Sequence, residues 1–239
     1  MIWEPMCAAV SSAERLLPPL PRLWWWDDPL PRAAAENMAV DEWLLLCQSP
    51  VPILRSYRWL QPAVTFGFAE KVAPIRALYP KREMTRRWTG GGVVEHGEDA
   101  TYSLILPRAC APDWQNSAAV YATVHEAVAI ALRARGLHAI GVGEGSQIPG
   151  SLCFQAPVRH DVLIDGRKVA GAGQRRTRDG VLHQGSLQGS AVLPGIACDL
   201  ASALAEHVEP MPEAFVPPAS ELQDLAIRRY LLPAWIDGR

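Results

Sequence analysis

The sequence has no excess of charge of either sign. Lysine and arginine together number 23, aspartate and glutamate number 25, and the formal net charge is −2. Such a chain has no overall field that attracts a polyanion, so we expect no nucleic-acid partner. No run approaches the roughly 18 apolar residues of a membrane helix, and Glu4 stands where a signal peptide would be basic. We therefore expect a cytoplasmic protein with no membrane partner.

Cysteine is sparse and badly spaced for cross-linking or metal binding. The five cysteines are an odd number, with no C-x-x-C pair and no Cys/His pair at zinc-ligand spacing. They are Cys7, Cys47, Cys110, Cys153 and Cys198. We expect a reducing compartment, no disulfide framework and no metal site.

Length and composition predict one globular domain. The chain has 239 residues, of which 49% are hydrophobic, enough for a sizeable core. Residues 1–22 are rich in Pro, Ala and Leu without a clean period, and we predict a poorly ordered leader there. Residues 23–239 are then the folded domain.

Periodicity predicts strands joined by hairpins, with helices entering singly. Helical spacing covers 33–47, 113–135, 196–207 and 221–230, and strand-like runs cover 53–59, 63–68, 101–106, 158–164, 168–175 and 181–187. Asp165-Gly166 and Asp179-Gly180 are type I′ hairpin dipeptides, so the last three runs form an antiparallel meander. This pattern predicts an α+β fold, a single domain with a mixed, largely antiparallel sheet flanked by helices.

A glycine run between two strands is the first candidate site. Gly90, Gly91 and Gly92 follow Arg86 and Arg87. Glycines allow backbone N–H groups to approach a ligand, and arginines bind carboxylate or phosphate. The alternative is a flexible turn with solvated arginines. The order of residues fits neither a P-loop nor a dinucleotide fingerprint.

Lys168 is the second candidate. It follows a hairpin turn and precedes the small residues 170–173, so its amine can reach across an open surface. The chain has only three lysines, Lys71, Lys81 and Lys168, against 20 arginines. A lysine in this position suggests a need for a compact ammonium group, although an exposed hairpin lysine is the simpler alternative.

Two further residues carry possible chemistry. Strand alternation turns His183 and Gly185 to one face and Gln184 and Ser186 to the other, and a strand histidine is usually a core residue. Cys153 lies in a loop, where a thiol nucleophile can be exposed, although most free cysteines are small buried hydrophobes.

Taken together, these motifs resemble one family. The segments RRWTGGGVVEH, DVLIDGRKVAGAGQRR and VLHQGSL, preceded by ENMAVDEWLL and RSYRWLQPAVTFGFAEKV, are similar to lipoate-protein ligases and octanoyltransferases, which are related to biotin-protein ligase. The resemblance runs from about residue 24 to residue 187. It implies a biotin/lipoate protein ligase-like fold and the attachment of a lipoyl or octanoyl chain to a lysine of a lipoyl domain.

The resemblance also implies roles for individual residues. Lys168 matches the lysine that contacts the acyl carbonyl or the adenylate. The residues expected to bind substrate are Arg86, Gly90, Gly91, Gly92, His96, Gly171, His183 and Gly185. A fixed ammonium polarises the carbonyl, which is what acyl transfer to an amine requires.

Cys153-Phe154 resembles the nucleophile step of the cysteine-dependent octanoyltransferases. In that branch an acyl carrier protein donates the chain, a thioester forms on the cysteine, and no cofactor is required. The acceptor is a lipoyl domain or the glycine cleavage H protein. Our hypothesis is therefore an octanoyltransferase with Cys153 and Lys168 as catalytic residues.

Three departures keep an ATP-dependent lipoate-protein ligase open as the alternative, acting on free lipoate with ATP and Mg. Gly90-Gly91-Gly92 stands where the cysteine branch more often has Gly-Gly-Arg, Glu95 to Asp99 replaces the usual His-Asp, and Gln184 follows His183. A third reading, from another class, is a non-catalytic acyl-binding homologue.

Overall fold

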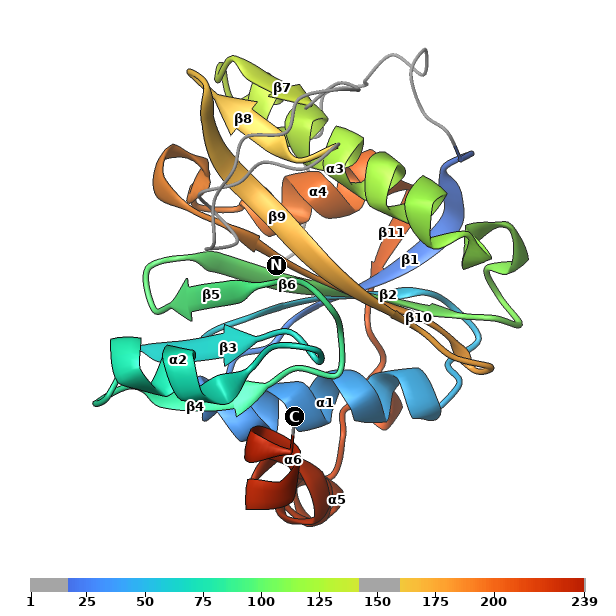
Figure 1. Cartoon of the computed structure of the whole chain (residues 1–239). Helices are drawn as coiled ribbons and strands as arrows, with labels where there is room; N and C mark the ends of the chain where they lie inside the picture. Colours follow the sequence, from blue (N-terminus) through green and yellow to red (C-terminus); the bar gives the residue numbers. More distant parts are fainter. Residues whose placement is uncertain (1–16, 142–159, 239) are drawn as a thin grey trace.

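A mixed eight-stranded sheet forms the centre of the protein. The computed structural model describes residues 17–141 and 160–238 (Figure 1). The strand order is β11-β1-β2-β6-β10-β9-β8-β7. Its strands are β1 (Leu20–Asp27), β2 (Ile53–Tyr57), β6 (Ala100–Pro107), β7 (Ala139–Gly141), β8 (Val162–Ile164), β9 (Arg167–Arg176), β10 (Gly180–Leu187) and β11 (Ala205–Pro210). β1 is parallel to both its neighbours, and the other described pairs in this sheet are antiparallel. The predicted fold class is confirmed.

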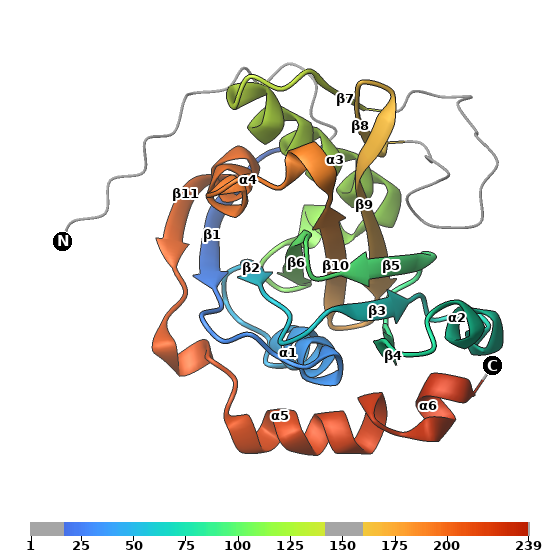
Figure 2. The same ribbon diagram turned by 90° about the vertical axis from the view of Figure 1, so that its left-hand side faces the viewer.

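A second, smaller sheet lies on one side of the main sheet. It consists of β3 (Ala63–Phe66), which is parallel to β4 (Glu83–Arg86) and antiparallel to β5 (Val93–His96). Figure 2 shows this sheet on the same side as α1 (Ala34–Leu46), whereas α3 (Ser117–Ala134) and α4 (Ile196–Leu204) cover the opposite side.

Strand alternation divides the core into these two sides. On β6, Leu104 packs in the cluster formed with α3 and α4, and its neighbour Ile105 packs in the cluster formed with α1. Both side chains are fully buried. The remaining helical elements are α2 (Val72–Leu78), α5 (Ala219–Leu225), a π-helical turn (Ala226–Tyr230), α6 (Pro233–Asp237) and three short 3-10 turns. Within the described residues, every helix is too short or too polar to cross a lipid bilayer.

Two predicted helices differ from those observed at their ends. α3 begins at Ser117 because the Asn116 side chain accepts the N–H groups of Ala118 and Ala119 at 3.0 and 3.2 Å, and the residues before it form a separate 3-10 turn. α4 ends at Leu204, and the chain continues directly as β11.

Pairing between β11 and β1 explains the second difference. Leu20 lies opposite Ala205 in this parallel pair, so β11 covers the edge of β1. The same pairing draws the start of regular structure to Leu20, before the residue 23 expected from composition.

The hairpin prediction is confirmed at one of its two turns. Asp165 and Gly166 have φ of 49° and 73°, as a type I′ turn requires. At the second turn Gly180 has φ of 149° and Asp179 is not left-handed, so β9 and β10 are joined by a longer loop. The antiparallel meander forms in both cases.

Candidate active site

A small cavity lies between the small sheet and the α1-facing side of the main sheet. Its volume is about 20 Å³, enough for about one water molecule. Three of the residues expected to bind substrate line it: His96 on β5, Gly171 on β9 and Gly185 on β10. The other walls come from α1, β3, β6 and the ends of β2 and β4.

The glycine loop, defined as residues 87–92, packs against two other glycines. A Cβ at Gly67 would lie 1.8 Å from the carbonyl oxygen of Gly91, and a Cβ at Gly173 would lie 2.3 Å from that of Gly90. Gly91 itself has φ of +90°, whereas a Cβ at Gly90 meets nothing within 4 Å. The Gly90 N–H donates to the carbonyl of Gln174 at 3.2 Å. Close packing therefore explains the need for glycine at positions 67 and 173, and substrate binding by Gly90, Gly91 and Gly92 stays a prediction.

Arg87, and not Arg86, faces the cavity. Arg86 is 1% exposed, and its guanidinium donates to the carbonyl oxygens of Gly67, Phe68, Glu70, Trp235 and Ile236. Arg87 donates to Thr65 Oγ1 at 2.7 Å and to the carbonyl oxygens of Gly90 and Gly92 at 3.0 and 2.8 Å. Successive residues of an extended chain point to opposite sides, so the prediction for Arg86 is corrected to its neighbour.

A chain of hydrogen bonds runs from Arg87 to Asp99 along one wall. Thr65 Oγ1 accepts from Arg87 and lies 2.7 Å from His96 Nε2, and His96 Nδ1 lies 2.7 Å from Asp99 Oδ2. Burial raises the pKa of the Asp99 carboxyl, but the attraction of His96 and the hydrogen bonds from His96, Ser186 and Gly97 outweigh it and hold that pKa below its ordinary value.

The Asp99 carboxylate also accepts hydrogen bonds from two hydroxyl groups at this end of the cavity. Asp99 Oδ2 accepts from Thr101 and Ser186 at 2.9 and 2.7 Å, and Thr101 Oγ1 accepts from Trp59 Nε1 at 2.8 Å. The Trp59 ring stacks on His96 with 4.0 Å between centroids. Because these polar atoms satisfy one another, ring faces and methyl groups remain to face the cavity.

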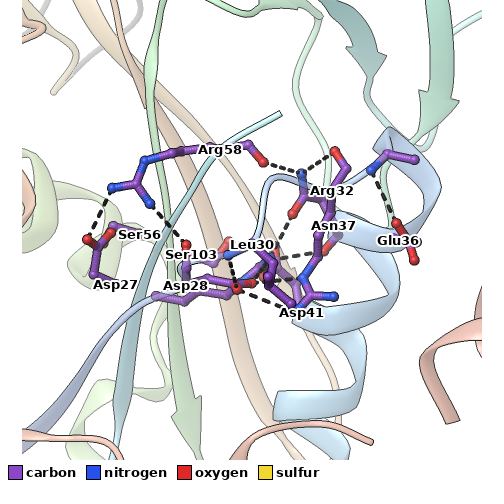
Figure 3. A network of polar contacts seen from close by, with 12 residues as sticks. Asp27, Asp28, Leu30, Arg32, Glu36, Asn37, Asp41, Ser56, Arg58 and Ser103 are labelled. Carbon is purple, nitrogen blue, oxygen red and sulfur yellow. Dashed lines mark hydrogen bonds and ion pairs between the residues drawn. The ribbon is translucent and has the colours of Figure 1, made fainter. Parts of the chain in front are cut away.

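A buried polar network beside α1, part of which Figure 3 shows, reaches the start of the glycine loop. Asp41 Oδ1 accepts from Arg55 at 2.8 Å, and Asp41 Oδ2 accepts from Ser103 and Gln184 at 2.5 and 2.7 Å. Gln184 Oε1 accepts from Thr89 Oγ1 at 2.7 Å. Gln184 thus ties the loop to α1, which is a role that its place in the motif did not indicate.

Arg55 completes that network on its far side. Its guanidinium donates to Asp28 at 2.8 Å and to Asn37 Oδ1 at 2.6 Å, and all of these side chains are buried. Figure 3 shows Asp28, Asn37 and Asp41 gathered beside α1. Removing one partner of such a buried pair typically costs about 3–5 kcal/mol.

Lys168 lies beside Gly171, which lines the cavity, and is not itself a lining residue. Its Nζ is 2.6 Å from Asp161 Oδ2, and the two side chains are 2% and 0% exposed. A Cβ at Gly171 would lie 2.7 Å from Lys168 Cε and 3.0 Å from Nζ, so the lysine occupies the space that a side chain there would need. Lys168 is therefore a buried, paired ammonium, and the alternative of an exposed hairpin lysine is wrong.

His183 lies on the opposite side of the sheet from the cavity. Its Nδ1 is 2.9 Å from the amide of Gln174, and its ring stacks on Tyr102 and meets His125 of α3 edge-on. Burial, together with nearby His125, lowers the pKa of His183 well below its ordinary value. The predicted alternation is confirmed, but it carries the His183 ring away from the cavity that Gln184 lines. The prediction that His183 contacts substrate is therefore corrected: its ring is buried in the core beneath α3.

Cys153 lies outside the described residues, and its catalytic role stays a prediction. Of the described cysteines, Cys47, Cys110 and Cys198 do not line the small cavity. Burial raises the pKa of the Cys47 thiol and raises that of Cys110 to about 11, which makes both poor nucleophiles at neutral pH.

A larger cavity of about 320 Å³ lies on the other side of the main sheet, between β1, β2, β6 and the start of α4. None of the predicted catalytic or substrate-binding residues lines it. The small cavity is therefore the candidate site.

Several site residues escaped the sequence reasoning. Trp59 and Thr65 lie within the segment RSYRWLQPAVTFGFAEKV, but nothing in their spacing marks them as site residues. Asp161 opens the motif that contains Lys168, seven residues earlier, and a carboxylate so close to a singular lysine was a usable signal.

The sequence is similar to a known protein family and to several of its curated members. Residues 33–207 match the family model described as the lipoyl protein ligase A/B catalytic domain. The octanoyltransferase LipM of Halalkalibacterium halodurans is 32% identical over 180 residues, which are 69% of this chain and 65% of that protein. The chain covers 60 to 65% of the length of eight such LipM relatives.

Solved structures share the fold. Protein Ta0514 of T. acidophilum, assigned as a lipoate protein ligase, superposes with a TM-score of 0.68 over 92% of this chain and 99% of its own, at 20% identity. A lipoate-protein ligase A bound with ATP gives a TM-score of 0.63 over 90% of this chain and 97% of its own, at 21% identity. The predicted biotin/lipoate protein ligase-like architecture is confirmed.

Proposed function

Because the chain belongs to the lipoyl protein ligase A/B catalytic-domain family, we propose that it is an octanoyltransferase of protein lipoylation. It moves an octanoyl or lipoyl group through a thioester on Cys153 to a lysine of a lipoyl domain protein or of the glycine cleavage H protein. The LipM relatives support this branch. The observation that carries the proposal is the buried Lys168 ammonium beside Gly171, a residue that lines the cavity next to the glycine loop.

Two displacements make up the reaction. The Cys153 thiol gives up its proton and attacks the thioester carbonyl of the acyl carrier protein, so that a new C–S bond forms. The bond from that carbonyl carbon to the carrier sulfur breaks, and the carrier leaves as a thiol with the proton that Cys153 gave up. The acceptor lysine, as the free amine, then attacks the enzyme thioester, loses a proton as the amide forms, and releases the Cys153 thiol. Each tetrahedral intermediate bears an oxyanion, and the Lys168 ammonium stabilises that charge.

The cavity walls suit the acyl chain. Trp59, His96 and Thr65 present apolar faces because their polar atoms are hydrogen-bonded to neighbouring side chains. An octanoyl chain is far larger than the present volume of about 20 Å³, so the side chains or the glycine loop move when it enters. This predicts a slot closed at rest that opens around a medium-length chain.

The alternative is an ATP-dependent lipoate-protein ligase acting on free lipoate, and the three consecutive glycines favour it. That reaction forms an acyl-adenylate from ATP with Mg. Among the described residues, no group of three or more His, Cys, Asp or Glu side chains is arranged to hold a metal ion. The transferase reaction needs neither ATP nor Mg, and it remains our proposal.

Intact mass spectrometry separates these functions. The protein is incubated with octanoyl-carrier protein, or with lipoate, ATP and Mg. A gain of one octanoyl group that hydroxylamine removes, and that Cys153→Ala lacks, supports the transferase. Pyrophosphate release with lipoate and ATP supports the ligase. Neither signal, with octanoate binding retained, indicates a non-catalytic acyl-binding homologue.

A further inference from the structure

A three-residue cluster holds the Lys168 ammonium from behind. Asp161 uses one carboxylate oxygen for each partner: Oδ2 is 2.6 Å from Lys168 Nζ, and Oδ1 accepts the Tyr121 hydroxyl at 2.6 Å. Asp161 is fully buried. A carboxylate gripped on both oxygens has its plane and its position fixed.

The cluster joins three separate elements near the cavity. Tyr121 lies on α3, Asp161 immediately precedes β8, and Lys168 is the second residue of β9. His125 of α3 lies 3.9 Å from Asp161 Oδ1 but bonds through Nδ1 to the carbonyl of His160 at 2.8 Å. Helix α3 thus sets the place of the carboxylate, and the carboxylate sets the place of the lysine.

The lysine needs such a constraint because its own stem is flexible. A lysine side chain has several rotatable bonds, and its ammonium is a point charge that acts only where it is held. Lys168 Cε lies where a Cβ at Gly171 would stand, so the stem packs on the strand backbone at this point. The contact between Nζ and the Asp161 carboxylate, at 2.6 Å, then holds the end of the stem.

We propose that Asp161, oriented by Tyr121, is the positioning residue that aims the Lys168 ammonium at the reacting carbonyl. This inference rests on the proposed function, because it assumes that Lys168 acts in acyl transfer. Asp161 does not touch substrate in this scheme, and its effect passes entirely through the lysine.

Kinetics of single variants test the proposal. Asp161→Asn keeps the shape and removes the charge, and it should lower the transfer rate roughly 10- to 100-fold, the range found for outer partners that orient metal ligands. The KM for octanoyl-carrier protein should change little, and Asp161→Glu should restore part of the rate. Tyr121→Phe should cause a smaller loss with the same pattern.

A matched control separates this effect from general damage. Tyr79 also donates its hydroxyl to a carboxylate, Glu95, at 2.9 Å, but on the exposed side of the small sheet. Tyr79→Phe should leave the rate unchanged. Thermal unfolding of every variant identifies loss of folding. If well-folded Asp161→Asn and Tyr121→Phe transfer at the wild-type rate, the proposal is wrong.

Lysine labelling gives a readout that does not depend on activity. The chain has only three lysines, and the exposed Lys71 and Lys81 serve as internal references. The protein is briefly acetylated with acetic anhydride, and its peptides are measured by mass spectrometry. Lys168 should be protected from acetylation in the wild type, and the extent of its acetylation should change several-fold in Asp161→Asn. Equal labelling of Lys168 in both proteins contradicts the positioning role. Failure of the proposed function would instead appear as a wild type with no acyl transfer but with this labelling difference intact.

Discussion

Gly67 lies directly beneath Gly91: a Cβ on the first would stand 1.8 Å from the carbonyl oxygen of the second. Gly173 approaches the carbonyl of Gly90 in the same way from the main sheet, at 2.3 Å. The glycine loop is therefore held between the residue that follows β3 and the middle of β9, and neither has a side chain at the point of contact. The shape of the site depends on glycines outside the GGG run as much as on those within it.

Gly173→Ala should displace the glycine loop, because its Cβ collides with backbone that cannot rotate away. We expect loss of acyl transfer and destabilisation of about 1–3 kcal/mol, the usual cost of overpacking. Gly90→Ala is the matched control, since its Cβ enters open space. Urea unfolding and the transfer rate check both. Equal effects of the two substitutions would contradict the packing argument.

Cys153→Ala should abolish the acyl-enzyme and the transfer, because the thiolate is the nucleophile of the proposed first step. The measurement is intact mass after incubation with octanoyl-carrier protein. Cys47→Ala and Cys110→Ala are the controls, because burial raises the pKa of each thiol. Undiminished transfer by Cys153→Ala would sink the thioester mechanism and leave the ligase alternative.

Lys168→Arg should fail almost as badly as Lys168→Ala. The lysine stem crosses Gly171 at contact distance and ends 2.6 Å from Asp161, so a broader guanidinium has no room to place its charge at the same point. The expected loss is about 10² to 10³ in rate, typical of removing one transition-state donor. Single-turnover kinetics measure it. Near wild-type turnover by Lys168→Arg would show that charge alone suffices.

The affinity for the acyl chain should rise with each added methylene group. Each buried methylene contributes about 0.8 kcal/mol, so hexanoate should bind roughly tenfold more weakly than octanoate. Competition of free fatty acids against octanoyl-carrier protein measures this. A flat response between these two chains would contradict a buried slot.

Stability should fall as the pH is lowered below 6.5, because two histidines are buried as neutral rings. Burial lowers the pKa of His125 to about 4, although Asp161 and the His160 carbonyl oppose it, and the pKa of His183 is lowered as well. Between pH 6.5 and 4 the unfolded chain binds more protons than the folded one, so acid favours unfolding.

Each histidine then contributes a slope of up to about 1.4 kcal/mol per pH unit in that window. Urea unfolding between pH 7.5 and 5 measures the slope above the range in which Asp28 and Asp99 titrate. His125→Asn keeps a donor for the His160 carbonyl and cannot titrate. Its slope should be shallower than that of the wild type, and an unchanged slope would show that His125 is not the responsible group.

Local patterns in the sequence predicted most of the elements. The apolar spacing of α1 and α3 and the Asp165-Gly166 turn depend on neighbours in the chain, so their signals are local. The boundary between α4 and β11 depends on pairing with β1, in which Leu20 lies opposite Ala205, 185 residues further along the chain. No local pattern carries that information.

The site shows the same division. Alternation correctly separates His183 from Gln184, but which face meets the cavity depends on where the small sheet docks. The choice between Arg86 and Arg87 also depends on docking, because either could face outward from an isolated strand. Motif resemblance identified the segments, and only tertiary contacts determined which side chain in each segment faces inward.

Helix α6 supplies hydrogen-bond acceptors to Arg86 on β4, the strand that leads into the glycine loop. Two of the carbonyl groups that hold Arg86 belong to Trp235 and Ile236, 149 and 150 residues further along the chain. Without α6, this buried guanidinium would lose two of its acceptors. Detachment of α6 would therefore disturb β4 directly before the glycine loop, although no residue of α6 lines the small cavity.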